Sequence, residues 1–161
     1  MPIRNIITDY SGRSKDINIF PTVNPRTKDA QPVVASFGPV SSYCAGVQKL
    51  IQRYTIALLT VKGSQPAYPK FGTNLLKQLA VSGIRTRADL THSFNFANAV
   101  VIDQFRTFQK DSAGDHPDEE LDTCVLQDVT VTKNYEVNYR VLMYTKAGAI
   151  LDFLLPIPIT K

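Results

Sequence analysis

The sequence contains no run of about eighteen apolar residues, the length that a transmembrane helix needs. Residues 1–5 are also not followed by the apolar stretch of a signal peptide. We therefore expect a soluble protein that is made in the cytoplasm of its host. With 161 residues and 43% hydrophobic side chains, the chain is long enough for one domain with a core and too short for two domains of typical size.

Cysteine is scarce, and the two cysteines have no metal-ligand spacing. Cys44 lies in a predicted helix and Cys124 in a predicted strand, so we expect buried free thiols rather than a disulfide. Histidine is equally rare, and His92, near the start of a predicted helix, is expected to be solvated. The sequence therefore predicts no metal and no cofactor.

Although the net charge is +4, the basic residues form no cluster along the chain. Lysines and arginines are spread over residues 1–42 and the helical part, whereas acidic residues concentrate in a loop over residues 111–122. Such a separation of charge favours steering between protein subunits over the tracking of phosphates. We therefore predict no nucleic acid and no membrane among the partners.

Two stretches have apolar residues at the spacing of three and four that is typical of amphipathic helices. The first predicts a helix over residues 47–61, with Ser41 or Ser42 as its N-cap and Lys49 on its polar side. The second predicts a long helix over residues 86–108. Its apolar face is expected in the core and consists of Leu90, Phe94, Ala97, Val101, Phe105 and Phe108.

Residues 60–74 have the composition of a stiff connection between helices. Glycine permits left-handed and tightly bent backbone, and proline fixes φ. One of the glycines is expected to close the first helix, and the ring of Tyr68 is expected to pin the loop to the core. Thr73 or Asn74 can cap a further helix over residues 75–81. We predict a structural turn that depends on Gly63, Pro66, Pro69, Phe71 and Gly72.

Residues 125–131 and 135–143 alternate apolar and polar side chains, which predicts a β-hairpin. A second turn leads to a third strand over residues 150–155. After it, Pro156 and Pro158 disfavour a continuing central strand and predict an extended tail.

The order of these elements predicts an α+β fold. Residues 1–42 are rich in proline, asparagine and charge and are expected to form an extended N-terminal arm, with strand-like alternation at residues 15–20. Residues 43–161 are expected to form a single domain with helices packed on one face of a small antiparallel sheet. The edges of such a sheet must pair, be covered, or be filled by another chain.

Three motifs follow one another in the chain. Residues 16–20 read Asp-hydrophobic-x-hydrophobic-Phe, residues 24–29 read Asn-Pro-x-Thr-x-Asp, and residues 60–72 read Thr-x-x-Gly-x-x-Pro-x-x-Pro-x-Phe-Gly. In order and spacing they resemble the sheath-initiator family, the small baseplate-wedge proteins of contractile phage tails, which has relatives in contractile injection systems. The family usually has a Glu-Pro-Arg triplet before its first strand; this chain has the acidic loop 111–122 there.

The resemblance implies a structural protein rather than an enzyme. Such a subunit surrounds the tail tube in a sixfold-symmetric ring and templates the first sheath ring through strand pairing between subunits, with a sheath-handshake-like sheet. The implied location is the tail baseplate of the virion, and the implied partners are baseplate wedge proteins, the tail sheath protein and the tail tube. The expected inter-subunit strand residues are Tyr135, Val137, Tyr139, Val141, Ile150 and Phe153.

Two other functions stay open at this point. Members of the family have been called lysozyme-like, and Asp118 with Glu120 would be the carboxylate pair of a peptidoglycan-cleaving enzyme. Against this, no feature of the sequence is expected to desolvate one of these carboxylates, and His116 has no Ser or Cys partner in a strained turn. The third interpretation is an unrelated assembly or binding module.

Overall fold

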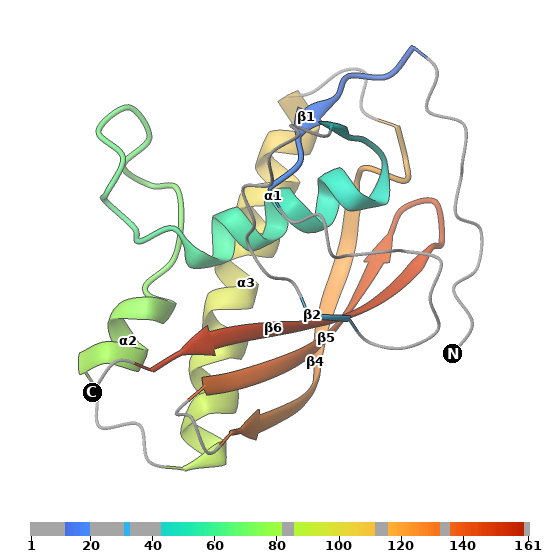
Figure 1. The fold of residues 1–161 in the computed structure, drawn as a ribbon. Helices are drawn as coiled ribbons and strands as arrows, with labels where there is room; N and C mark the ends of the chain where they lie inside the picture. Colours follow the sequence, from blue (N-terminus) through green and yellow to red (C-terminus); the bar gives the residue numbers. More distant parts are fainter. Residues whose placement is uncertain are drawn as a thin grey trace.

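The computed structural model describes residues 12–19, 31–32, 43–81, 86–111, 116–132 and 136–159. Within these residues the helices are α1 (Val47–Leu59), α2 (Leu75–Val81) and α3 (Arg87–Asp111). The long strands are β4 (Leu121–Val131), β5 (Glu136–Thr145) and β6 (Ile150–Pro158). Three two-residue strands are β1 (Asp16–Ile17), β2 (Gln31–Pro32) and β3 (Tyr43–Cys44) (Figure 1).

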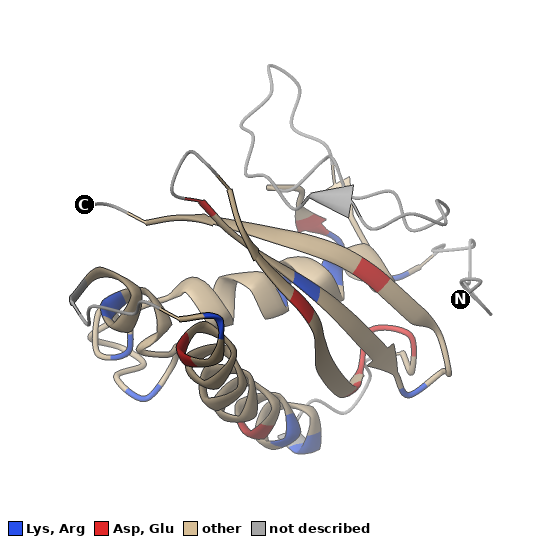
Figure 2. Cartoon of the chain, turned by 90° about the horizontal axis from the view of Figure 1, so that it is seen from below, with Lys and Arg blue, Asp and Glu red and all other residues tan. Residues whose placement is uncertain are grey.

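The helices lie on one face of the main sheet, as Figure 2 shows with the sheet above them. This arrangement confirms the predicted α+β fold. In the sheet, β5 lies between β4 and β6 and is antiparallel to both. β2 adds to the outer edge of β6 in the parallel direction, so the sheet is mixed rather than wholly antiparallel. β1 and β3 form a separate two-stranded sheet.

Aromatic rings from the helices pack against rings from the inner face of the sheet. Phe94 of α3 stacks on Tyr139 of β5 with ring centroids 4.7 Å apart, and Tyr54 of α1 meets Phe153 of β6 edge to face at 6.3 Å. All four side chains are fully buried. Such pairs add stability beyond that of their buried area, and here they fix both helices on the sheet.

A buried hydrogen-bond chain connects both long helices to β4. Tyr54 Oη donates to Asn98 Oδ1 at 2.7 Å, and Asn98 Nδ2 donates to the carbonyl oxygen of Cys124 at 2.8 Å. Cys124 and Cys44 are free and buried, as predicted. Burial raises the pKa of the Cys124 thiol to about 12, so this cysteine stays protonated.

The bounds of α1 correct two sequence predictions. The helix begins after Gly46, and Cys44, which was predicted to be helical, lies in β3. It ends at Leu59, short of the predicted Val61, because Thr60 leaves the helix with φ −70° and ψ 127°. The candidate caps at positions 41 and 42 lie outside the described residues.

The start of α3 agrees closely with its prediction. The backbone N–H of Thr86 donates to Asp89 Oδ2 at 3.2 Å, and that of Asp89 donates to Thr86 Oγ1 at 3.1 Å, which is a reciprocal capping box. Five of the six predicted core positions of α3 are buried. The sixth, Phe108, is 46% exposed, and His92 is exposed as expected.

The prediction that the third strand ends at Leu155 is wrong. β6 continues through Pro156 to Pro158. The N–H of Thr145 donates to the carbonyl of Ala149 at 3.0 Å, and bonded and non-bonded pairs alternate along an antiparallel ladder. In the β5–β6 register, this alternation means that the N–H groups of even-numbered β6 residues point away from β5. Prolines at these positions therefore remove no hydrogen bond between the two strands.

A buried ion pair connects α1 to the segment before β4. Lys49 was predicted on the polar side of the helix, yet it is fully buried and its Nζ donates to Glu119 Oε2 at 2.8 Å and to Ser14 Oγ at 2.7 Å. The Gly46 N–H donates to Glu119 Oε1 at 2.9 Å, so this carboxylate lies at the positive end of the α1 dipole. Burial alone raises the pKa of Glu119, but Lys49 and Gly46 outweigh it and hold this pKa below its ordinary value of 4.5.

The N-terminal segment 12–19 is bound to this ion pair and to α1. Arg13 Nη1 donates to both carboxylate oxygens of Asp118, at 2.6 and 2.7 Å, and Asp118 is fully buried. Further along, Gln52 of α1 accepts from the N–H of Ile19 at 2.7 Å and donates to the carbonyl of Ile17 at 2.8 Å. This described part of the predicted arm is thus packed against the helix.

We expect Glu119→Gln to lower the free energy of unfolding by about 3–5 kcal/mol at neutral pH, because it leaves the Lys49 ammonium buried without a counter-charge. The pKa of Glu119 is lower in the folded chain than the ordinary 4.5, so its stabilising contribution is present above pH 4.5 and is lost as the pH falls through the folded value. Denaturant unfolding measured from neutral to acid pH should show this loss in the parent chain and less of it in the variant.

Glu120→Gln is the matched control, because it changes a neighbouring carboxylate that pairs at 2.5 Å with the half-exposed Lys146. A pair of this kind contributes about 1 kcal/mol or less. Equal losses in the two variants would contradict the special weight given to the buried Glu119 pair.

Candidate functional site

The turn between α1 and α2, residues 60–74, projects from the end of α1 and is closed at its base (Figure 1). The N–H of Lys62 donates to the carbonyl of Thr73, and the N–H of Thr73 donates to the carbonyl of Thr60, both at 2.8 Å. The Thr73 hydroxyl donates to the carbonyl of Leu58 at 2.7 Å and accepts from the first N–H of α2 at 3.1 Å. The predicted cap of α2 is therefore confirmed for Thr73.

The two prolines are the second residues of successive reverse turns. The N–H of Tyr68 donates to the carbonyl of Gln65 at 3.1 Å across Pro66, and the N–H of Phe71 donates to the carbonyl of Tyr68 at 3.0 Å across Pro69. Proline is favoured as the second residue of such turns because its φ is already correct. The repeated spacing of the motif therefore matches a repeated local geometry.

Both glycines of the turn have left-handed backbone, with φ 84° at Gly63 and 93° at Gly72. Gly63 lies within the turn and does not close α1 as predicted, since the helix ends earlier, at Leu59. A Cβ at Gly72 would lie 2.3 Å from the carbonyl oxygen of Thr60, whereas a Cβ at Gly63 would meet no atom within 4 Å. Glycine is therefore required at position 72 by space as well as by conformation.

Gln104 of α3 fastens the turn to the body of the protein. Its Nε2 donates to the carbonyls of Lys70 and Gly72, at 3.2 and 3.0 Å, and its Oε1 accepts from the N–H of Gly72 at 3.3 Å. Phe71 packs near Phe108 of α3, with ring centroids 6.4 Å apart. One side-chain amide and one aromatic contact thus hold the turn against α3.

The prediction that the ring of Tyr68 pins the loop to the core is wrong, because Tyr68 is 65% exposed. Together with Phe71, Phe108 and the exposed Phe96, it lines an open groove of about 940 Å³ between the turn and α3. We call this feature the aromatic groove. Its other lining residues are Lys62, Ala67, Pro69, Lys70, Ala99, Val100, Asp103, Gln104 and Thr107.

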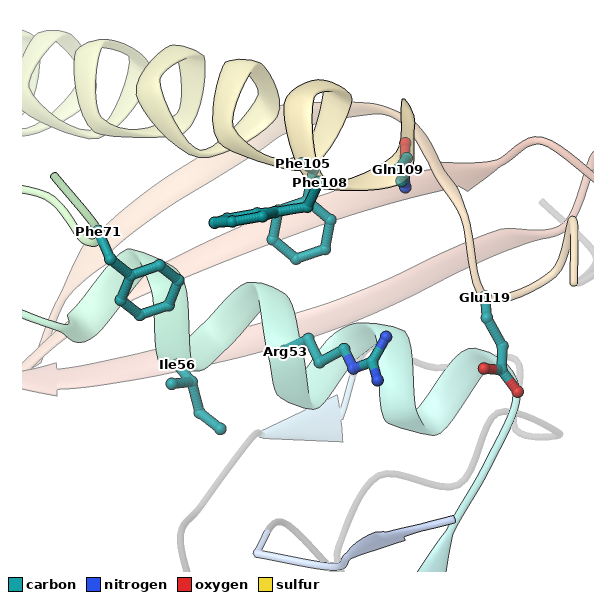
Figure 3. A pocket seen from close by; sticks show the side chains of 7 residues that line it. All are labelled: Arg53, Ile56, Phe71, Phe105, Phe108, Gln109 and Glu119. Carbon is teal, nitrogen blue, oxygen red and sulfur yellow. The ribbon is translucent and has the colours of Figure 1, made fainter. Parts of the chain in front are cut away.

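A smaller pocket of about 250 Å³ lies between α1, α3 and the turn (Figure 3). Ile56 and the rings of Phe71, Phe105 and Phe108 line its apolar part. Arg53, Gln109 and Glu119 line the remainder, and Figure 3 shows Arg53 pointing toward these two. The pocket shares Phe71 and Phe108 with the aromatic groove, so the two cavities adjoin.

The predicted inter-subunit residues of β5 do not lie at an edge of the sheet. Val137, Tyr139 and Val141 are fully buried, and β5 is paired on one side with β4 and on the other with β6. Within this chain β5 therefore has no free edge, and its pairing with another subunit stays a prediction. Phe153 is buried on β6 and Ile150 is half-buried at its start, while position 135 lies outside the described residues.

The outer edge of β4 is protected by α3 and by side chains of the strand itself. Asn98 of α3 binds the carbonyl of Cys124, and Asp128 Oδ1 accepts the N–H of Val129 at 2.8 Å. Arg87 of α3 in turn holds Asp128 in an ion pair. Two irregularities in the β4–β5 register bend the edge further, so β4 is a poor template for another strand.

The outer edge of β6 is limited in a different way. Pro156 and Pro158 provide no N–H there, so backbone donors on this edge are confined to the first part of the strand. In that part β2 pairs with Phe153 and Leu154 over two residues. β6 is therefore the long strand that already pairs, on its outer edge, with a segment from another part of the chain.

The carboxylates considered for the enzyme interpretation lie in ion pairs. Asp118, which was not expected to be desolvated, is fully buried with both oxygens on Arg13. Glu120 pairs with Lys146, and His116 is exposed. Acid–base cleavage needs a carboxyl that can exchange its proton next to a second carboxylate, and these contacts lend that chemistry no support.

Comparisons with protein-family models, with curated proteins and with solved structures found no match for this chain. Within the described ranges, no group of three or more His, Cys, Asp or Glu side chains could hold a metal ion. None of the described helices is long and apolar enough to cross a membrane.

We expect Gly72→Ala to destabilise the chain more than Gly63→Ala. Left-handed backbone costs a residue with a Cβ about 1–2 kcal/mol at either position. The clash with the Thr60 carbonyl adds about 1–3 kcal/mol at position 72 only. Thermal and denaturant unfolding of the two variants would measure this difference, and equal costs would contradict the closed base of the turn as its cause.

Proposed function

We propose that this chain is a structural subunit of a contractile-tail baseplate, of the sheath-initiator kind, that surrounds the tail tube and templates the first sheath ring. The order and spacing of its motifs support the proposal. The geometry of the longest motif supports it as well. Its prolines lie in reverse turns, and a Cβ at its second glycine would clash with the Thr60 carbonyl. In this role the protein holds partners in position and performs no chemistry.

The observation that carries the proposal is the addition of β2 to the outer edge of β6. Strand addition binds partners through backbone hydrogen bonds and sets their register through alternating side chains. Because β5 is internal and β4 is guarded by α3, we propose that a strand of another subunit pairs with the first part of β6, up to Leu155, in the place that β2 takes within this chain. The partners under this proposal are sheath subunits, baseplate wedge proteins and the tail tube, with the copies in a sixfold-symmetric ring.

We expect Leu154→Pro to block strand addition while leaving the β5–β6 ladder intact. The N–H of Leu154 faces the outer edge, in phase with Pro156 and Pro158, so a third proline removes a donor on the side where β2 or a partner strand pairs and none on the side of β5. Leu154→Ala, which keeps the N–H, is the control. In particles assembled with each variant, we expect the proline variant to give baseplates with bare tubes and the alanine variant to give sheathed tails.

Cryo-electron microscopy of intact particles tests the assignment directly. The expected result is density for this chain around the tube, between the baseplate and the first sheath ring, with a sheath strand next to β6. Sheathed tails with normal yield in the Leu154→Pro variant, or particles without this chain at that position, would overturn the proposal. Turnover of purified peptidoglycan that disappears in Glu120→Gln would support a lysozyme-like enzyme instead.

A further inference from the structure

The aromatic groove leaves several large aromatic side chains exposed. Tyr68 is 65% exposed and Phe96 is 59% exposed, and Phe108 is also exposed at the border with the smaller pocket. Tyrosine and phenylalanine are enriched in protein interfaces, where large rings provide contact area with few rotamers to immobilise. The volume of the aromatic groove, about 940 Å³, is larger than a single side chain would fill.

The floor of the groove is a second stripe on α3, distinct from the stripe in the core. Phe96, Val100, Asp103 and Thr107 recur at spacings of three and four, so they lie along one side of the helix. Ala99 interrupts the larger side chains. A small residue at such a place lets a second helix approach at the usual distance of about 8–10 Å.

The wall of the groove is built from two reverse turns and its floor from a helix, so neither is a strand. The carbonyls of Lys70 and Gly72 and the N–H of Gly72 are bound by Gln104, and the N–H of Lys62 is bound by Thr73. An extended peptide would therefore find side chains but no strand edge to pair with. A helix satisfies its own backbone and needs only an apolar face, so it fits this surface better.

Charge selects the kind of helix. Lys62 and Lys70 line the groove on the turn side, and neither makes an ion pair within the described part of the chain. Asp103 is the single carboxylate among the lining residues. The excess of positive charge favours a partner with acidic residues beside its apolar face.

We propose that the aromatic groove binds an acidic amphipathic helix of a partner protein, which lies along α3 with its apolar face over Phe96 and Ala99 and its carboxylates near Lys62 and Lys70. The turn is held in place by Gln104 and Gly72 before the partner arrives, so binding orders few groups. This inference does not depend on the proposed place of the chain in a contractile tail.

The test uses the full chain and a synthetic stapled helix of about sixteen residues, with Leu and Phe on one face and Glu on both flanks. In spectra of the ¹⁵N-labelled protein, we expect peptide-induced shifts over residues 66–71 and 96–108. By fluorescence anisotropy, Phe96→Ser should weaken binding by about tenfold or more. Lys70→Glu should weaken it by about two- to fivefold and should favour a peptide whose Glu residues are replaced by Lys.

Tyr43→Ser is the matched control for Tyr68→Ser, because the two rings are 66% and 65% exposed and only Tyr68 lines the groove. Tyr68→Ser should weaken binding and Tyr43→Ser should not. Equal affinity in the parent chain and Phe96→Ser, shifts confined to the sheet, or no binding by the parent chain would overturn the proposal. Self-association of the chain that Phe96→Ser abolishes would also overturn it, and would assign the groove to a second copy.

Discussion

The buried contact between Lys49 and Glu119 is the constraint on which the remaining structure depends. It joins residues 70 positions apart, at the start of α1 and directly before β4. A buried charge is costly without its partner, so neither the helix nor the segment before the sheet can be placed alone. Arg13 and Asp118 extend the same condition to the N-terminal segment. The helical layer, the sheet and the described part of the arm are therefore placed together.

α3 imposes a second constraint, because three polar side chains on it bind two other parts of the chain. Asn98 and Arg87 act on the edge of β4, the first through a backbone carbonyl and the second through Asp128. Gln104 holds the turn after α1. The same helix that closes the core thus also decides which surfaces remain available, since it covers one edge of the sheet and forms the floor of the aromatic groove.

The sequence predicted what depends on local periodicity and turn chemistry. The long helices, the β-hairpin and the cap of α2 follow from side chains within a few positions of one another. The buried pair of Lys49 and Glu119 and the contacts of Gln104 could not be predicted in this way, because their partners are distant in the chain and each residue type is usually exposed. The central position of β5 in the sheet was not predicted, because alternation of apolar and polar residues indicates a strand but not whether it is central or at an edge.

The two surfaces that remain available differ in what they can contribute to assembly. The outer edge of β6 offers backbone groups over a short stretch, because proline removes the outward donors at its end. An added strand of that length fixes direction and register, but it gains few hydrogen bonds, each of modest net value. The aromatic groove has the opposite character, with much apolar surface and no strand edge. If both proposals hold, the groove would contribute most of the affinity for a partner and the strand edge most of its orientation.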